Sequence, residues 1–311
     1  MKPFRKNVAI AIDGGGIRGV IVTKALSMVE DELGKSVHDI FRLAAGTSTG
    51  SIIAAGIGTG LTAHQMHDLY ISLGKTIFKK SWRTFFWPLT RFRFPNEPLI
   101  KVLNKNLGDK RMGDFWKAAP PTDVVITTFD LLSNKTCFIK PWKREYKDWP
   151  VARAVLASCS IPTYFPVVGG RYVDGGVGSY ADPCYVAAYE ASFCLKWHPR
   201  ETTLISLGTG RDPHSIKPGQ PGKFMAWEWL TPTLDAFLTS AGDQQVHLVD
   251  TFFSDLDFRR FQVDLSEESP LDDPRQIPKL IKYGEKLGMM ILNDQDDRAI
   301  GVKPEMPVSK S

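Results

Sequence analysis

The sequence has few cysteines and lacks any long apolar run. Its four cysteines form no Cys-x-x-Cys pair and no cluster typical of a metal site. Buried or incidental thiols in a reducing compartment are the simplest interpretation. No apolar stretch approaches the roughly 18 residues of a membrane-spanning helix, and the run 8–12 is too short for the core of a signal peptide. We therefore expect a cytoplasmic protein that contacts membranes, if at all, from one side.

Internal repeats, low-complexity tracts and Ser/Gly-rich linkers are also missing, so no boundary divides the chain. With 311 residues, of which 43% are hydrophobic and 23% charged, the chain can bury a sizeable core. We expect one large α/β domain over 1–311, with a flexible tail at 304–311. The net charge of +5 is modest and agrees with an anionic surface as partner.

A glycine-rich loop follows the first strand-like run. The apolar segment 8–12 leads into Asp-Gly-Gly-Gly-Ile-Arg-Gly at 13–19, and a helical pattern follows that ends at Gly34. The spacing Gly14-x-Gly16-x-x-Gly19 is typical of a dinucleotide site, where the backbone approaches a pyrophosphate. The same bare amides can instead point at a developing oxyanion.

The next predicted strand, 41–45, favours the second interpretation. A dinucleotide fold needs an acid at the end of that strand to bind the ribose, but Asp39 lies before the strand. The strand runs instead into Gly-Thr-Ser-Thr-Gly at 46–50, followed by a small, apolar helical stretch. This is the Gly-x-Ser-x-Gly pattern of a nucleophile elbow, which would expose the Ser48 hydroxyl at a tight turn over a helix N-terminus.

None of the histidines has a convincing setting as the base for Ser48. Two of them, at 64 and 67, fall in a predicted helix that a Thr62/Gln65 capping box begins. The apolar neighbours of His247 favour a core position. The chain order Ser…Asp…His would still allow a later histidine to complete a triad. The candidates are His198, His214 and His247, and the remaining histidine is His38.

Asp174 is the better candidate for the base. It ends the strand-like piece Arg-Tyr-Val-Asp at 171–174 and is followed by Gly175 and Gly176, which predicts an exposed acid on a tight turn. A plain hairpin turn has the same signature. A carboxylate is a weak base for a hydroxyl, with an ordinary pKa of about 3.9. Burial can raise that pKa, and strong oxyanion stabilisation can supply what the base lacks.

Together the three motifs resemble the patatin-like phospholipases, a family of lipid acyl hydrolases with a Ser–Asp dyad, and their bacterial members in particular. The order and spacing of 14–19, 46–50 and 174–176 match the family pattern. Two further segments match as well: 157–166 before the Asp-Gly-Gly and 205–210 after it. The resemblance covers roughly residues 7–210.

This resemblance implies a role for each motif residue. Ser48 would be the nucleophile and Asp174 its base, and no metal or organic cofactor would be required. The oxyanion hole would be formed by amides of the glycine loop, namely those of Gly14, Gly15 and Gly16. Gly15 and Gly16 would be the chief donors. Arg18 would hold a lipid phosphate, tie down the loop or form a surface salt bridge. The other supporting residues are Gly19, Gly46, Gly50, Gly175 and Gly176.

The expected reaction is hydrolysis of a carboxylic ester through an acyl-enzyme, with the protein acting as a phospholipase A or lysophospholipase. Phospholipid, lysophospholipid and neutral acylglycerol all suit the same dyad. Two other classes stay open. One is an oxidoreductase that binds a dinucleotide at the glycine loop, and the other is a catalytically idle lipid-binding or scaffolding protein on the same fold.

An unusual interval lies between Asp68 and Glu97, where the chain has no acidic residue. We expect the segment 69–96 to form an insertion or lid and 75–94 to contact a membrane peripherally, because aromatics beside cations suit anionic headgroups. A folded insertion with core aromatics and a phosphate-rich ligand site are the alternatives, and nucleic acid is not an expected partner. The residues concerned are Lys75, Phe78, Lys79, Lys80, Trp82, Arg83, Phe85, Phe86, Trp87, Arg91, Phe92, Arg93 and Phe94.

Apolar strands that alternate with helical stretches predict a mainly parallel sheet covered on both faces. The resemblance implies the same architecture, a three-layer α/β/α fold. Asp13–Gly16, Ser48 and Asp174 should then meet at the carboxyl ends of their strands. Further strands are expected at 122–128, 136–139, 203–207 and 260–265, and helices at 151–158, 185–191 and 277–292.

Overall fold

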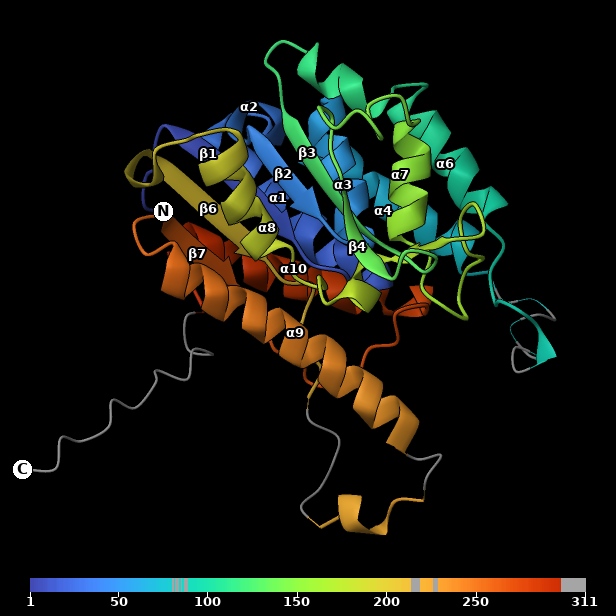
Figure 1. Cartoon of the computed structure of the whole chain (residues 1–311). Coiled ribbons are helices and arrows are strands. Elements are labelled where there is room, and N and C mark those ends of the chain that lie inside the picture. Colours follow the sequence, from blue (N-terminus) through green and yellow to red (C-terminus); the bar gives the residue numbers. More distant parts are fainter. Residues whose placement is uncertain are drawn as a thin grey trace, which may run out of the picture.

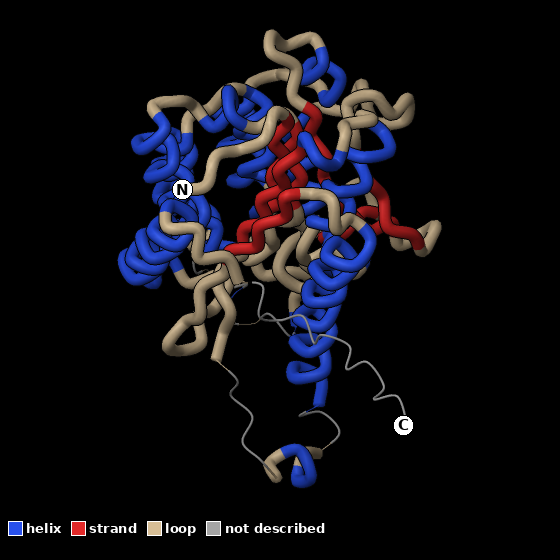
Figure 2. The backbone as a smooth tube through the Cα atoms, turned by 90° about the vertical axis from the view of Figure 1, so that its left-hand side faces the viewer, coloured by secondary structure: helices blue, strands red, loops and turns tan. Residues whose placement is uncertain are grey.

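The computed structural model describes residues 1–79, 81, 84, 86, 89–213, 219–225 and 229–297, without the side chains of 75 and 230–238. The predicted tail 304–311 lies outside the described residues. Helices cover both faces of a central sheet (Figure 1), and a view turned by 90° shows the strands between two helical layers (Figure 2). This confirms the expected three-layer α/β/α architecture.

The sheet has seven strands in the order β4-β3-β2-β1-β6-β7, and β5 pairs with β3 away from this path. The pairs that join β3, β2, β1, β6 and β7 are parallel, whereas β4 and β5 both run antiparallel to β3. The sheet is therefore mainly parallel, as predicted. The strands are β1 (Asn7–Ile12), β2 (Leu43–Gly46), β3 (Asp123–Asp130), β4 (Lys135–Ile139), β5 (Tyr172–Asp174), β6 (Thr202–Leu207) and β7 (Asp257–Phe261).

Two helices, α8 and α9, cover one face of the sheet, and the other helices pack on the opposite face and around its edge (Figure 1). Short 3₁₀ turns fill several connections, and a π-helical turn at Glu190–Cys194 extends α8. The helices are α1 (Gly19–Leu33), α2 (Val37–Ile40), α3 (Thr49–Thr59), α4 (Ala63–Ile77), α6 (Glu97–Leu107), α7 (Val151–Ser158), α8 (Cys184–Tyr189), α9 (Leu230–Phe252) and α10 (Ile277–Leu292).

The core follows from the two-residue period of the central strands. In β1, Val8, Ile10 and Ile12 join the large core that α1, α3 and α10 also line, whereas Ala9 and Ala11 join a smaller core shared with α8 and α9. Both sets are buried, because a central parallel strand has helices on each face. The continuous apolar run in the sequence is thus explained.

Several predicted helix boundaries are confirmed. Gly34 ends α1 with a left-handed backbone at φ 59°, and Thr62 begins α4 with the predicted capping box. The prediction of a core position for His247 is wrong, because this side chain is exposed on α9. The helix turns Gln245, Val246 and Val249 inward at a period of 3.6, so His247 faces outward although its neighbour Val246 is buried.

Only part of the basic and aromatic insertion at 69–96 lies among the described residues. The calls on Lys80, Trp82, Arg83, Phe85 and Trp87 lie outside them, as does the side chain of Lys75. Phe94 is buried and Phe78 packs edge-on against it, whereas Phe86 and Leu89 are exposed. In the part of the chain that the structure describes, no helix combines the length and the apolar composition needed to cross a membrane.

Candidate active site

Ser48 and Asp174 are brought together by two strands that share one edge of β3. β2 pairs with the first half of β3, up to Gly46 opposite Ile126, and β5 pairs with the second half, where Asp174 lies opposite Thr128. Because β2 runs parallel and β5 antiparallel to β3, their carboxyl ends point toward each other. Both residues are therefore at carboxyl ends, as predicted, but β5 approaches from the opposite direction to β2.

Ser48 occupies a strained turn between β2 and α3. Its backbone has φ 53° and ψ −123°, outside the regions that side chains other than glycine favour. Close approach of the chain on both sides forces this geometry: a Cβ on Gly46 would lie 2.2 Å from the Gly50 carbonyl oxygen, and one on Gly50 would lie 2.1 Å from that of Ile12. The Ser48 amide donates to Ser158 Oγ at 2.8 Å, and this hydrogen bond ties the turn to the end of α7.

Asp174 is buried and only partly satisfied. Its Oδ1 accepts from the Gly176 amide at 2.8 Å, and its own amide donates to the Ser160 carbonyl at 3.0 Å. Oδ2 is buried and accepts no hydrogen bond of normal geometry from any described residue. Burial raises the pKa of Asp174 to about 6, although the Gly176 amide and the nearby Ser48 hydroxyl both favour the carboxylate.

The glycine loop is held so that two of its amides stay free. Gly14 N–H donates to the Ala181 carbonyl at 2.9 Å, and Ile17 N–H donates to the Leu271 carbonyl at 2.9 Å. The amides of Gly15 and Gly16 donate to no group that the structure describes. Gly16 has φ +57°, and a Cβ there would lie 2.5 Å from the Leu271 oxygen. Of the three predicted oxyanion donors, Gly14 is thus already engaged, and Gly15 and Gly16 remain available.

Arg18 lies just beyond the loop and forms a salt bridge. Its Nη1 is 2.7 Å from Asp212 Oδ2, in the segment after β6, which matches one of the roles expected for it. Its Nε is buried and has no hydrogen-bond partner among the described residues. Gly19, the first residue of α1, leaves room for the side chains of Thr49 and Tyr70.

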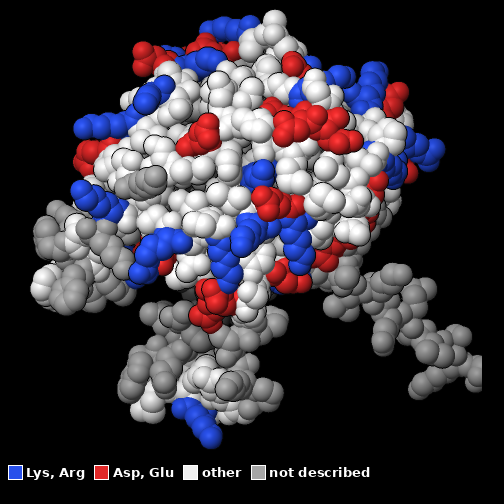
Figure 3. All heavy atoms as spheres, turned by 180° about the vertical axis from the view of Figure 1, so that it is seen from behind, with Lys and Arg blue, Asp and Glu red and all other residues white. Residues whose placement is uncertain are grey.

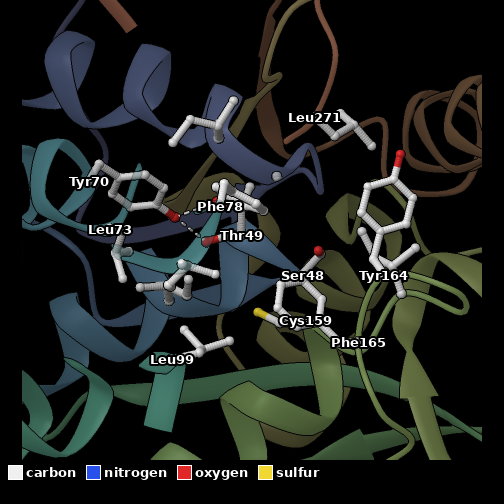
Figure 4. Close-up of a pocket in the computed structure, with 15 residues that line it drawn as sticks. Ser48, Thr49, Tyr70, Leu73, Phe78, Leu99, Cys159, Tyr164, Phe165 and Leu271 are labelled. Atoms are coloured by element: carbon white, nitrogen blue, oxygen red, sulfur yellow. Dashed lines mark hydrogen bonds between the residues drawn. The ribbon is translucent and has the colours of Figure 1, made fainter. Parts of the chain in front are cut away.

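An apolar pocket opens over Ser48 (Figure 4). The Ser48 hydroxyl points into the space between Tyr164 and Leu271, and Cys159 lies beside the serine. The cavity volume of about 40 Å³ makes the pocket a narrow slot. The apolar lining suits an acyl chain, which needs the lining side chains to move apart. The lining comprises Gly16, Ile17, Ser48, Thr49, Ile52, Tyr70, Leu73, Ile77, Phe78, Leu99, Cys159, Ile161, Tyr164, Phe165 and Leu271.

No histidine that the structure describes lines this pocket. His38 Nδ1 lies 2.7 Å from the Ile57 carbonyl, and His64 Nε2 pairs with Asp31 at 2.9 Å. His67 lies on α4 and faces Thr23 of α1, and burial and the Lys24 charge lower its pKa. His198 precedes a 3₁₀ turn at the start of β6, and His214 lies outside the described residues.

The acid expected for a dinucleotide site is also misplaced. Asp39 is exposed on α2, which precedes the amino end of β2. The glycine loop follows the carboxyl end of β1, and the two strands are parallel neighbours. Asp39 therefore lies near the amino ends of these strands, and the loop lies at their carboxyl ends. Among the described residues, no group of three or more His, Cys, Asp or Glu side chains is arranged to hold a metal ion.

Several residues around the site were not predicted individually. Ser158, Ser160, Tyr164 and Phe165 all come from the segment 157–166, which contributed only to the family resemblance. Thr209, in the similar segment 205–210, donates to the Gly14 carbonyl at 2.5 Å. In the sequence, these residues were indicated only by the match of their segments to the family pattern. The fold shows that the segments contact the serine turn, Asp174, the pocket and the glycine loop.

A mainly parallel sheet between helical layers, with a serine on a strained strand–turn–helix connection above an apolar pocket, defines an α/β protein of the acyl hydrolase type. The family model described as patatin-like phospholipase matches residues 10–187, which is more than half of the chain. The chain therefore belongs to the patatin-like phospholipase family. Membership of this family supports lipid acyl hydrolase activity on lipid esters.

Similar proteins include patatins of Solanum tuberosum and two bacterial proteins of known structure. Patatin-1-Kuras 2 of Solanum tuberosum is 27% identical over 289 residues, which cover 79% of this chain and 75% of the relative. Patatin-08 of the same plant is 29% identical over 263 residues, covering 71% and 66%. VipD from Legionella pneumophila has a TM-score of 0.49 and 12% identity over 94% of this chain and 67% of its own. ExoU from Pseudomonas aeruginosa, in complex with SpcU, has a TM-score of 0.37 and 15% identity, and the match covers 90% of this chain and 52% of ExoU.

Proposed function

We propose that this protein hydrolyses carboxylic ester bonds of lipids as a phospholipase A or lysophospholipase, with Ser48 as nucleophile and Asp174 as base. The observation that carries the proposal is the pairing of a strained serine with a buried carboxyl: the Ser48 hydroxyl favours the Asp174 carboxylate, and Oδ2 accepts no hydrogen bond of normal geometry from the described residues. A buried acceptor without a partner costs free energy. The Ser48 hydroxyl would donate to this acceptor when a substrate is bound.

The mechanism follows from these groups. Ser48 Oγ attacks the ester carbonyl as Asp174 Oδ2 takes its proton, and the tetrahedral oxyanion accepts from the Gly15 and Gly16 amides. The alcohol or lysolipid leaves with that proton. Water then attacks the acyl-enzyme, again with Asp174 as base, and the fatty acid is released. The acyl chain would occupy the apolar pocket beside Ser48.

The test is labelling with a fluorophosphonate probe together with hydrolysis of a short soluble ester. The unsubstituted protein should label and turn over, whereas Ser48→Ala should do neither. Asp174→Asn should keep the fold and lose most turnover. The matched control is Ser72→Ala, which removes an exposed serine on α4. Labelling that persists in Ser48→Ala would refute the assignment, and full turnover in Asp174→Asn would refute the role of the base.

An idle lipid-binding protein on the same fold is the second candidate, because an acid with a pKa near 6 is still a weak base. It predicts lipid binding without labelling at Ser48. The misplaced Asp39 leaves the dinucleotide alternative without support.

We also propose that 1–311 form a single acyl hydrolase domain and that 75–94, within the insertion 69–96, contacts a membrane peripherally. Phe86 and Leu89 are exposed, as are Lys79 and Arg91 of the same segment, which supports the docking proposal. On the face seen in Figure 3, Lys and Arg are interspersed with Asp and Glu, so this face offers no single basic patch. A docking surface is better sought near the insertion.

The docking segment can be tested with Lys79→Glu combined with Arg91→Glu. Activity on anionic liposomes should fall more than activity on a short soluble ester, because headgroup attraction is lost while the site is kept. Lys282→Glu, an exposed change on α10, serves as the control for charge. Equal losses on both substrates would show that the segment supports the fold and not the membrane contact.

A further inference from the structure

A buried ion pair holds the first residue of the glycine loop. Arg260, on the outermost strand β7, donates from Nη1 to Asp13 Oδ1 at 2.8 Å and from Nη2 to Asp13 Oδ2 at 2.6 Å. Both residues are buried, and this two-point geometry fixes the orientation of the carboxylate as well as its distance. Asp13 directly precedes the three glycines.

The strand register explains how an edge strand reaches this loop. Ala11 on β1, Ser206 on β6 and Arg260 on β7 lie in one row across the sheet. Asp13 is two residues beyond Ala11 and so faces the same side of the sheet. Arg260 extends past Ser206, whose Oγ it contacts at 2.7 Å, and reaches Asp13 one strand further on.

The same guanidinium also holds the segment Ala181–Asp182, which contacts the glycine loop. Arg260 Nη1 lies 3.1 Å from Asp182 Oδ2, and Asp182 Oδ1 accepts from the Cys184 amide at the start of α8. The residue before Asp182 is Ala181, whose carbonyl accepts from Gly14 N–H. Arg260 is thus connected to the loop by two routes, through Asp13 and through the Ala181–Asp182 pair.

This cluster has two carboxylates for one guanidinium and little contact with water. Burial and the Asp182 charge raise the pKa of Asp13 to about 7, although Arg260 and Arg18 favour its ionised form. Burial also raises the pKa of the Cys184 thiol, with Asp182 adding to the effect. On α9, burial raises the pKa of Asp243 against the charges of Arg211 and Arg260.

We propose that Arg260 is a positioning residue for the ester hydrolysis: by holding Asp13 and Asp182, it fixes the glycine loop so that the free amides of Gly15 and Gly16 face the oxyanion formed at Ser48. This inference rests on the proposed function. Arg260 does not touch substrate in this scheme and acts through the loop alone.

Substitution of Arg260 should therefore damage turnover and spare binding. Arg260→Lys keeps the charge but cannot reach both oxygens of Asp13 together with Asp182. We expect kcat to fall about tenfold to a hundredfold, because the Gly15 and Gly16 amides are no longer held in the orientation that the oxyanion needs. KM should change by less than about threefold. The inhibition constant of a non-hydrolysable ether lipid should likewise stay within about threefold, since it forms no oxyanion.

Asp13→Asn is the second variant: its amide oxygen still accepts from one Arg260 nitrogen, and Asp182 keeps the guanidinium paired. In the unsubstituted protein, kcat/KM should fall with two successive protonations, of Asp13 near pH 7 and Asp174 near pH 6. Asp13→Asn should lose the first step and keep the second. A purely structural role for Asp13 would give the Asp174 step alone in both proteins.

The matched control is Arg259→Lys. Arg259 is the neighbouring buried arginine on β7, but it pairs with Asp257 and with the carbonyls of Lys2 and Pro3, away from the loop. It should lower thermal stability without the selective loss of kcat. Hydrogen exchange of a peptide covering 13–19 gives a readout that does not need activity: exchange should speed up in Arg260→Lys and Asp13→Asn and stay unchanged in Arg259→Lys.

The outcomes separate the two claims. Unchanged loop exchange or unchanged kcat in Arg260→Lys overturns this inference, whatever the unsubstituted protein does. Faster loop exchange in a protein that neither labels at Ser48 nor hydrolyses esters supports Arg260 as the loop anchor and overturns the proposed function instead.

Discussion

Asp174 must be ionised to accept a proton from Ser48, and its burial works against ionisation. With the pKa of Asp174 raised to about 6, the base is mostly ionised at pH 7.5 and mostly protonated at pH 5. In the Asp13→Asn protein, which lacks the Asp13 protonation near pH 7, we expect kcat of a short soluble ester to be half-maximal near pH 6 and to fall about tenfold per pH unit well below it. A pH–rate profile between 4.5 and 8.5 checks this, and half-maximal turnover near pH 4 would contradict a desolvated base.

The same burial predicts that ionised Asp174 lowers the stability of the fold. The folded state holds the Asp174 proton more tightly than the unfolded state, so the stabilisation is complete below about pH 4 and is lost as pH rises through about 6. Raising the pKa from 3.8 to about 6 corresponds to about 3 kcal/mol. Asp174→Asn should therefore raise the free energy of unfolding at pH 8 by up to about 3 kcal/mol.

Denaturant unfolding of both proteins at pH 8 and pH 4 measures that difference. The gain should shrink toward zero at pH 4, because this pH lies close to the ordinary pKa of a carboxyl, so unfolding then releases only part of the Asp174 proton. A gain that is the same at both pH values would point to packing and not to charge. Loss of turnover together with gain of stability is the pattern expected of a residue retained for chemistry.

The pocket is shaped by helices that approach it from two sides, and α6 supplies a side chain that can be tested alone. Leu99 is buried and lines the pocket, whereas Leu103, one turn later on the same helix, is buried in the core away from it. Both Leu99→Ala and Leu103→Ala should lower the free energy of unfolding by about 2–5 kcal/mol.

Only Leu99→Ala should also change acyl-chain preference. Removing this side chain widens the slot, so kcat/KM should shift toward longer acyl groups in a series of p-nitrophenyl esters from four to about sixteen carbons. Measured relative to the short ester, Leu103→Ala should keep the original preference. The same shift in both variants would place the acyl chain outside this pocket.

Elements could be predicted where one local pattern decided them. The helix over 151–158 and the helix over 277–292 were predicted with their observed bounds, because each carries a clear amphipathic period. The long helix α9 was not predicted, since its start lies in a stretch rich in Thr and Pro, and Val246 and Val249 of its later part pack on the sheet. β7 begins at Asp257, three residues before the predicted strand, because its charged residues are buried in ion pairs that the sequence does not reveal.

The site as a whole was predictable only in its motifs. Ser48 and Asp174 stand in patterns that specify turns, but their meeting depends on β2 and β5 sharing an edge of β3. The contact of Arg260 with Asp13 spans 247 positions and crosses an intervening strand. No local pattern encodes such a pairing, since it follows from strand order and register.

Across the whole molecule, perturbed carboxyls occur at both ends of β3. At the amino end, Asp123 Oδ1 accepts from Trp116 Nε1 at 3.1 Å, and Oδ2 is buried with no hydrogen bond of normal geometry from the described residues. Glu190 accepts from Trp142 and from the Lys140 ammonium. Burial and the Glu190 charge raise the pKa of Asp123 to about 8. Ser48 lies beyond the opposite end of β2, the parallel neighbour of β3.

This separation predicts that stability and turnover respond to pH independently. The Asp123 proton stabilises the folded state fully below about pH 4, and that contribution is lost as pH rises through about 8. Asp123→Asn should therefore flatten the fall in Tm between pH 5 and pH 9, while the pH dependence of kcat stays that of the unsubstituted protein. Asp148→Asn, an exposed carboxyl, should change neither curve. If Asp123→Asn moved the pH–rate profile, the two ends of the sheet would be coupled, and the acid limb could no longer be assigned to the residues around Ser48 alone.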